Sequence, residues 1–179
     1  MNLANKLTIL RILLVPVFML FLLNKFPYGD AIAAAIFIFA AITDTLDGYI
    51  ARKRNMITNF GKLMDPLADK LLVSAALISL VQMGRIPAWM VVVIIAREFT
   101  ISILRALAAS EGIVIAASKW GKLKTVTQIV AIVAMLLHNF PFSYIGFPFD
   151  IVMMYVAVAM TIISGVDYIM INKHMIKYD

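Results

Sequence analysis

Four aspartates, Asp44, Asp47, Asp65 and Asp69, lie near the ends of two consecutive apolar segments of this chain. If both segments are helices, the first two aspartates share one helix face and so do the last two, because residues three or four positions apart are neighbours on a helix. Carboxylates at the edge of a bilayer are costly unless they are compensated. Four of them close together would repel one another and partly protonate unless divalent cations neutralise them. The spacing therefore predicts a centre that binds one or two metal ions.

The types of side chain available restrict the metal. The chain has no cysteine, and neither His138 nor His174 is near the aspartates in sequence. Ligation by oxygen alone is typical of Mg²⁺ or Mn²⁺, with Ca²⁺ as a further option. Mg²⁺ held by carboxylates usually keeps positions open for water and for substrate phosphates. We therefore expect Mg²⁺ or Mn²⁺ and chemistry on a phosphorylated substrate.

The composition indicates a membrane protein. Of the 179 residues, 63% are hydrophobic, and the mean hydropathy of +0.96 lies outside the range of soluble domains. Six apolar stretches each approach the roughly 20 residues that a helix needs to cross a bilayer. They are Leu7–Leu23, Ala31–Ile50, Leu63–Met83, Pro87–Ala109, Lys122–Leu137 and Ile151–Ile171. We predict one all-α membrane domain over residues 1–179, an integral bundle of six transmembrane helices.

The distribution of Lys and Arg predicts the orientation, since cytoplasmic loops are enriched in both. With six spans, one side receives Lys6, Arg11, the Arg52–Lys62 loop, Lys119 to Lys124, Lys173 and Lys177. The other side receives Lys25 and Arg85. Both termini and the aspartates are therefore expected on the cytoplasmic side of a multi-pass inner-membrane protein. The net charge of +6 then reflects topology and anionic ligands, and we expect no nucleic-acid partner.

Small and basic residues follow the first pair of aspartates. Gly48 and Ala51 are one turn apart, and small residues let a ligand or another helix approach closely. Helix packing is their usual role, but the adjacent carboxylates favour contact with a nucleotide or phosphate. Arg52 can clamp phosphate oxygens. We interpret Lys53 and Arg54 as membrane-orienting charges.

Pro66 lies between the second pair of aspartates. Proline is favoured in the first turn of a helix, where its missing N–H costs nothing. This placement predicts Asp65 at a helix N-terminus, with Asp69 one turn deeper. Asp69 is then either a metal ligand or a general base, because a carboxylate near a bound metal can accept a proton from an attacking hydroxyl.

The fourth apolar stretch carries a polar stripe. Glu98, Ser102 and Arg105 recur at the spacing of one helix face, and charges within membrane helices generally face the bundle interior or a wet cavity. For Glu98, a structural ion pair with an arginine and a functional role are equally compatible with the sequence. Arg97 falls on a different part of the helix surface and is expected to make a different contact. We interpret Asp167 as structural.

Further cations lie at the starts of the first and fifth apolar stretches. Lys119, Lys122 and Lys124 are either topology signals or a second anion pocket. Thr8 and Arg11 are one turn apart. Arg11 either extends to lipid phosphates, as long basic side chains commonly do, or joins a ligand site near the aspartates.

The aspartate run resembles a known family signature. The pattern Asp44-x2-Asp47-Gly48-x2-Ala51-Arg52-x8-Gly61-x3-Asp65-x3-Asp69 matches every fixed position of the signature of the CDP-alcohol phosphatidyltransferases. Outside the signature, Thr8-x2-Arg11-x4-Pro16, Ala96–Phe99 with Leu104-Arg105, and Gly121-Lys122-x-Lys124-Thr125 resemble the bacterial phosphatidylglycerophosphate synthases. The resemblance covers most of the chain. Ala4 departs from the proline that such enzymes often have, but it is not a site residue.

The resemblance implies a reaction in phospholipid biosynthesis, in which sn-glycerol 3-phosphate attacks CDP-diacylglycerol and gives phosphatidylglycerol phosphate and CMP. It also implies that Asp44, Asp47, Asp65 and Asp69 bind two divalent metals and that Asp69 is the base. Residues implied to contact CDP-diacylglycerol are Asp44, Gly48, Ala51, Arg52 and Lys62. Candidates for binding glycerol phosphate are Thr8, Arg11, Arg105, Lys119, Lys122 and Lys124. Family members tend to be homodimers, which implies the same here.

Several other functions share some of these features. Inositol-phosphate, serine and cardiolipin-forming transferases carry the same aspartate signature. A cation transporter can place acidic residues in a membrane bundle, but it is expected to have them near the midplane on broken helices. Polyprenyl transferases also use Asp-rich motifs with Mg²⁺, but with different spacing and more helices. A purely structural protein has no use for four clustered carboxylates.

Overall fold

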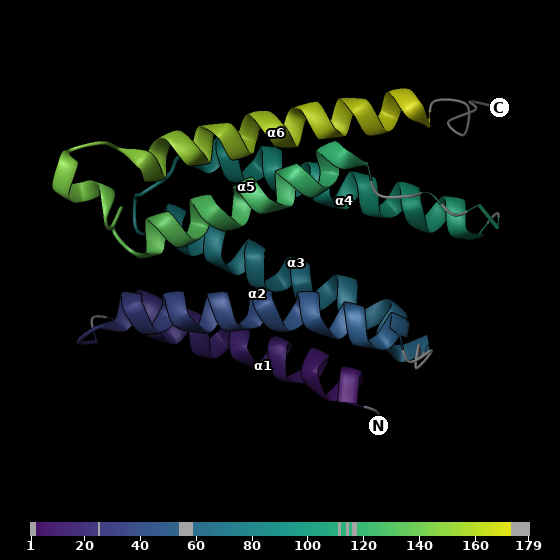
Figure 1. The fold of residues 1–179 in the computed structure, drawn as a ribbon, viewed down its shortest axis with the longest axis horizontal. Coiled ribbons are helices and arrows are strands. Elements are labelled where there is room, and N and C mark those ends of the chain that lie inside the picture. The colour runs from purple at the N-terminus through teal and green to yellow at the C-terminus, as the bar shows by residue number, and fades with distance from the viewer. Residues whose placement is uncertain are drawn as a thin grey trace. The chain divides into compact units, whose positions relative to one another are not determined.

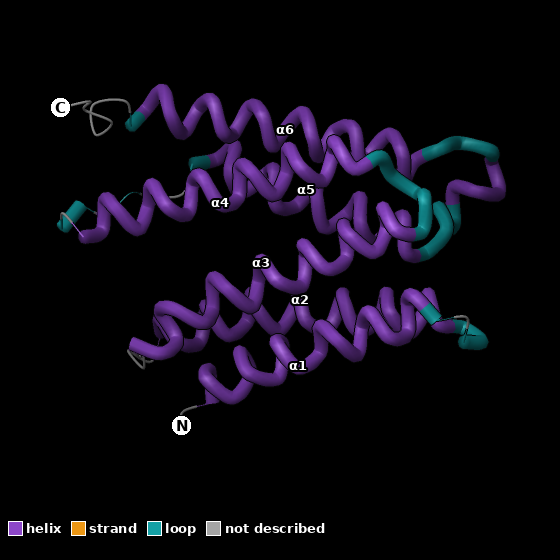
Figure 2. The backbone as a smooth tube through the Cα atoms, turned by 180° about the vertical axis from the view of Figure 1, so that it is seen from behind, coloured by secondary structure: helices purple, strands orange, loops and turns teal. Residues whose placement is uncertain are grey.

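The structure is a computed structural model, and it describes the backbone of residues 3–24, 26–53, 59–110, 112–113, 115 and 118–172. Within these ranges the side chains of residues 3–5, 44–53, 59–63 and 65–66 lie outside the description. The described part consists of helices and their connections, with no strand (Figures 1 and 2). The all-α class predicted from the sequence is therefore confirmed for these residues.

The six predicted apolar stretches correspond one to one with six α-helices in the described part of the chain. These are α1 (Leu3–Leu23), α2 (Gly29–Lys53), α3 (Asn59–Gln82), α4 (Ala88–Ser110), α5 (Lys119–Leu136) and α6 (Phe149–Ile171), with a short 3-10 helix, η1 (Phe142–Ile145), before α6. Most helices extend a few residues beyond the apolar stretch that predicted them. Backbone hydrogen bonding does not require apolar side chains, so a helix continues into polar residues at its ends.

The start of α3 corrects one expectation. Because α3 begins at Asn59, Pro66 lies well inside the helix, and the prediction that it occupies the first turn is wrong. The prediction that Asp65 is at a helix N-terminus is wrong for the same reason. The apolar pattern becomes continuous only near Leu63, so the single apolar residue of the first turn, Phe60, gave no signal for a helix start.

The chain divides into two compact units, Met1–Arg85 and Ile86–Asp179. In the first unit, α1 packs against both α2 and α3. Phe18 of α1 and Phe37 of α2 are fully buried, and their ring centroids are 6.1 Å apart. The start of α1, the end of α2 and the start of α3 lie at one end of this unit (Figures 1 and 2).

In the second unit, α6 packs against α5 and α4. Small and polar residues on its buried face, among them Ala157, Thr161, Ser164 and Gly165, allow neighbouring helices to approach closely. The hydroxyl of Thr161 donates to the carbonyl of Ala157 at 2.7 Å, which satisfies a buried polar group within the helix. Packing against α6 thus fixes the positions of both α4 and α5.

Asn139 holds the connection between α5 and α6. Its φ of 61° lies in the left-handed region, which asparagine tolerates better than most residues. Its Nδ2 donates to the carbonyl of Phe147 at 2.6 Å, and its Oδ1 accepts from the backbone N–H of Asp150 at 3.1 Å. One side chain therefore fixes both the connection and the start of α6.

Within the described residues, two helical segments are long and apolar enough to cross a membrane, Lys6–Leu23 and Phe149–Ile171. Gly29–Thr43 is a shorter apolar segment. Crossing by all six helices, with both termini cytoplasmic, stays a prediction from the sequence.

Candidate active site at the helix ends

The acidic motif lies on the two helices that meet at one end of the first unit. Asp44, Asp47, Gly48, Ala51 and Arg52 are in the last turns of α2. Lys62, Asp65 and Asp69 are in the first half of α3. Because the chain reverses direction between α2 and α3, both halves of the motif come to the same end of the unit (Figure 1).

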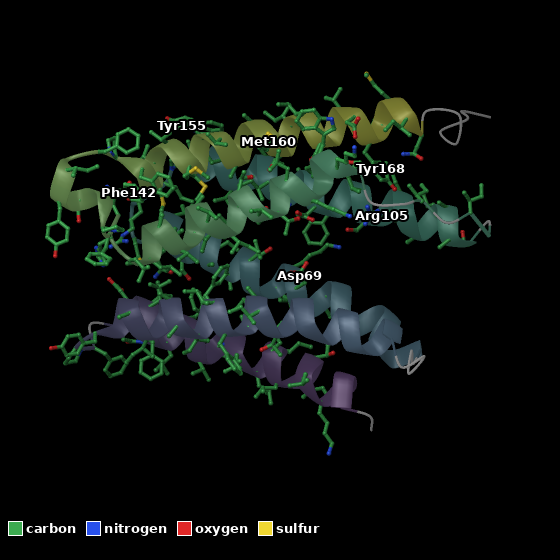
Figure 3. All side chains as sticks on the ribbon, in the orientation of Figure 1. Asp69, Arg105, Phe142, Tyr155, Met160 and Tyr168 are labelled. Carbon is green, nitrogen blue, oxygen red and sulfur yellow. The ribbon has the colours of Figure 1, made fainter. Side chains whose placement is uncertain are left out.

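Asp69 is the member of the motif whose side chain the structure describes. Its side chain, labelled in Figure 3, is exposed, while the adjacent Ala68 is fully buried. Ala68, Leu72 and Ala76 form the buried stripe of this part of α3, so Asp69 lies at the margin of the packed face. The other predicted site side chains on α2 and α3 are outside the described residues, and the convergence of four carboxylates stays a prediction.

Thr8 and Arg11 are buried on α1, with 1% and 3% of their surfaces exposed. They share a helix stripe with the buried Phe18 and Leu22, on the helix that packs against α2 and α3. This burial favours a role for Arg11 inside the first unit over an extended contact with lipid phosphates. Arg11 and Thr8 lie toward the end of α1 at which the acidic motif lies.

Cations gather at one end of the second unit. Arg105 on α4 and Lys119 and Lys122 on α5 are exposed. The guanidinium of Arg105 lies 5.5 Å from the ring centre of Tyr168 on α6 (Figure 3), which is a cation–π distance. The buried Tyr168 thus limits where the Arg105 side chain can extend.

The first turn of α5 is capped by Ser118. The backbone N–H of Gly121 donates to the Ser118 hydroxyl oxygen at 3.0 Å, which satisfies one of the free amide groups at a helix start. Lys119 and Lys122 are therefore on a well-defined helical turn. A helix N-terminus carries partial positive charge, which adds to that of the lysines.

Glu98 links α4 to α5. Its carboxylate pairs with the Nζ of Lys124, and it also lies 3.9 Å from Nη1 of Arg97. Lys124 is 2% exposed, and an ammonium group that buried requires a counter-charge. The sequence left open whether Glu98 forms a structural ion pair with an arginine or has a functional role. The structure shows an ion pair, and its main partner is Lys124 on another helix rather than Arg97 on the same helix.

Arg97 occupies a space left by two glycines. A Cβ added at Gly165 of α6 would lie 3.3 Å from Cγ of Arg97, and one added at Gly121 of α5 would lie 3.8 Å from its Nη2. Sequence reasoning missed Gly165 and Tyr168. A glycine in the apolar run of α6 was the available signal for the first, because it marks a close approach.

Comparison with known proteins defines the class. Residues 1–163 match the CDP-alcohol phosphatidyltransferase family, so the match extends over both units. The chain belongs to this family.

Particular members of the family are similar to this chain over three quarters or more of their own length. The CDP-diacylglycerol–glycerol-3-phosphate 3-phosphatidyltransferase of Bacillus subtilis is 50% identical over 98% of this chain and 97% of its own length. The enzyme of that name from Rickettsia typhi is 38% identical over 93% of this chain and 94% of its own. The one from Pseudomonas fluorescens is 39% identical over 80% of this chain and 76% of its own.

The ion pair between α4 and α5 predicts a difference between two lysines. Lys124→Met should lower the free energy of unfolding by about 2 kcal/mol, because it leaves the half-buried Glu98 without its main counter-charge. Lys119→Met removes an exposed charge and should change it by less than about 0.5 kcal/mol. Unfolding of the detergent-solubilised variants measures both, and equal stabilities would contradict this account of Lys124.

Proposed function

We propose that this chain transfers the phosphatidyl group of CDP-diacylglycerol to sn-glycerol 3-phosphate, giving phosphatidylglycerol phosphate and CMP in phospholipid biosynthesis. The observation that carries the proposal is 50% identity, over 98% of the chain, to a relative with that activity in its name. The aspartate signature supports transfer from a CDP-alcohol, because its spacing is that of the family as a whole, but it does not select the acceptor. The more distant relatives with the same name agree.

Asp44, Asp47, Asp65 and Asp69 are proposed to hold two divalent ions, Mg²⁺ or Mn²⁺. The family generally uses divalent metals, and a set of four carboxylates suits hard cations. The placement of both halves of the motif at one end of the first unit supports this assignment. When bound, the ions would neutralise the diphosphate and stabilise CMP as the leaving group.

The protein's own side chains then have separate tasks. Gly48 and Ala51 leave room for the CDP moiety, and Arg52 and Lys62 bind its phosphates. A hydroxyl of glycerol phosphate attacks the phosphorus that carries diacylglycerol, and the bond from this phosphorus to the CMP oxygen breaks. Asp69 accepts the hydroxyl proton. The exposure of the Asp69 side chain supports this role, since a base must be reachable by the acceptor.

Arg105, Lys119, Lys122 and Lys124 are proposed to bind the phosphate of the acceptor, together with Thr8 and Arg11. The acceptor is a dianion that approaches an anionic diphosphate, so it needs cations of its own. Support comes from the concentration of positive charge at the start of α5, where three lysines follow a capped helix N-terminus. Because Lys124 is buried, its charge acts from within the helix packing.

The bacterial relatives and the two apolar helices indicate a membrane protein. We propose that all six helices span the inner membrane, with both termini and the site on the cytoplasmic side, and that the chain is a homodimer. The lipid tails of CDP-diacylglycerol would then stay in the bilayer while its headgroup reacts at the cytoplasmic surface. The mean hydropathy and the distribution of Lys and Arg support this topology.

An acceptor assay tests the proposed activity. Purified protein with CDP-diacylglycerol and Mg²⁺ should release CMP with glycerol 3-phosphate, and at least about tenfold more slowly with serine, inositol phosphate or phosphatidylglycerol. Release of CMP with serine alone, for example, would show that serine rather than glycerol 3-phosphate is the acceptor, and it would leave the family assignment intact. No release with any acceptor would contradict the proposal.

Substitution of Asp69 tests its role as the base. Asp69→Asn keeps the size of the side chain but removes its capacity to accept a proton, so kcat should fall by roughly 100-fold or more. Asp150→Asn, in the first turn of α6, is the matched control and should retain kcat. Near-native turnover by Asp69→Asn would exclude Asp69 as the base.

A further inference from the structure

Glu98 is a carboxylate shared between two cations of the second unit. It pairs with Lys124 of α5 and lies 3.9 Å from Arg97 of α4, and a quarter of its own side chain is exposed. Both cations are well shielded from solvent, with 2% of the Lys124 side chain and 15% of the Arg97 side chain exposed. Shielded cations need a counter-charge, so the position of Glu98 governs where both of them lie.

Arg97 is seated against the first turn of α5. Its Nη2 lies 3.8 Å from the point where a Cβ of Gly121 would be, and Gly121 donates its N–H to the Ser118 cap. A guanidinium beside a helix N-terminus is electrostatically unfavourable, because both are positive. Glu98 offsets part of this repulsion. The Nε of Arg97 is buried and donates to no acceptor in the described part of the chain.

Among the described residues of this unit, the exposed lysines and arginines are Arg105, Lys119 and Lys122. Lys119 and Lys122 are on the same turns of α5 as Gly121, and Arg105 is farther along α4 from Glu98. Lys124 follows Lys122 on α5, so fixing Lys124 to α4 fixes the orientation of the turn that carries both exposed lysines. The ion pair between Glu98 and Lys124 therefore ties the start of α5 to α4, in addition to the packing of both helices on α6.

We propose that Glu98 is a positioning residue for the acceptor. Its carboxylate holds Lys124 and Arg97 in place, so that the start of α5 presents Lys119 and Lys122 to the acceptor phosphate in a fixed geometry. This inference rests on the proposed function, because it assumes that the phosphate of the acceptor binds at this end of the second unit. Glu98 itself, as an anion, does not bind the phosphate.

Steady-state kinetics of Glu98→Gln and Glu98→Asp test the role. The glutamine variant keeps the size of the side chain but loses its charge, so the KM for glycerol 3-phosphate should rise about tenfold. The KM for CDP-diacylglycerol and kcat should stay within about twofold, because the diphosphate binds the other set of residues. Glu98→Asp keeps the charge and should recover the KM for glycerol 3-phosphate to within about threefold of native.

Asp30→Asn is the matched control. It removes the ion pair between Asp30 and Arg85, which are 3.9 Å apart in the first unit and similarly half-buried. The loss of a structural ion pair alone should leave both KM values as in the native protein. An unchanged KM for glycerol 3-phosphate in Glu98→Gln, or a parallel loss in kcat and both KM values, would overturn the proposal.

A binding measurement separates this inference from the proposed function. Inorganic phosphate and glycerol 3-phosphate should each raise the melting temperature of the native protein and of Asp30→Asn, and the same rise in Glu98→Gln should need about tenfold more ligand. This pattern would support the role of Glu98 even if the native protein released no CMP, which would refute the proposed activity alone. Equal stabilisation of all three proteins, or of none, would overturn the role of Glu98.

Discussion

Compensation of charge in a very apolar chain is the constraint on which this structure depends. The chain is 63% hydrophobic, yet its charged residues include clusters of a single sign. Clustered charges of one sign, removed from water, are stable only with partners or bound ions. In the second unit the partner is visible, because Glu98 lies between Lys124 and Arg97. In the first unit, the partners that we propose for the aspartate motif are divalent cations.

In the first unit, the helical fold meets this constraint by placing the charged residues of the acidic motif toward helix ends. The reversal of the chain between α2 and α3 brings the two halves of the acidic motif to one end of the first unit, and α1 packs against both helices. The buried stripe of α1 changes from apolar residues, Phe18 and Leu22, to polar ones, Thr8 and Arg11, toward that same end. The apolar packing and the polar site are thus parts of one continuous helix face. A similar change occurs on α5, where the buried residues run from Lys124 and Gln128 to Ala131 and Ile132.

The sequence predicted the helices well because each is built on an apolar stretch of nearly its own length. It predicted the start of α3 poorly, since the first turn, from Asn59 to Lys62, holds a single apolar residue, Phe60, and Pro66 imitates a helix start. The acidic motif was recognisable because its members are close in sequence and their spacing is that of helix neighbours. The ion pair between Glu98 and Lys124 was not recognisable from the sequence, because it joins two helices and depends on how α4 and α5 pack against α6. The space that Gly121 and Gly165 leave for Arg97 depends on the same packing.

Binding of Mn²⁺ tests the central assignment most directly, because it does not depend on turnover or on the acceptor. Electron paramagnetic resonance of the detergent-solubilised protein, titrated with Mn²⁺ in the presence of CDP, counts the bound ions. We predict about two tightly bound ions per chain, and the loss of most of this binding in Asp65→Asn. A native protein that binds no Mn²⁺ in stoichiometric amounts, or an Asp65→Asn variant that binds as much as the native protein, would contradict the account.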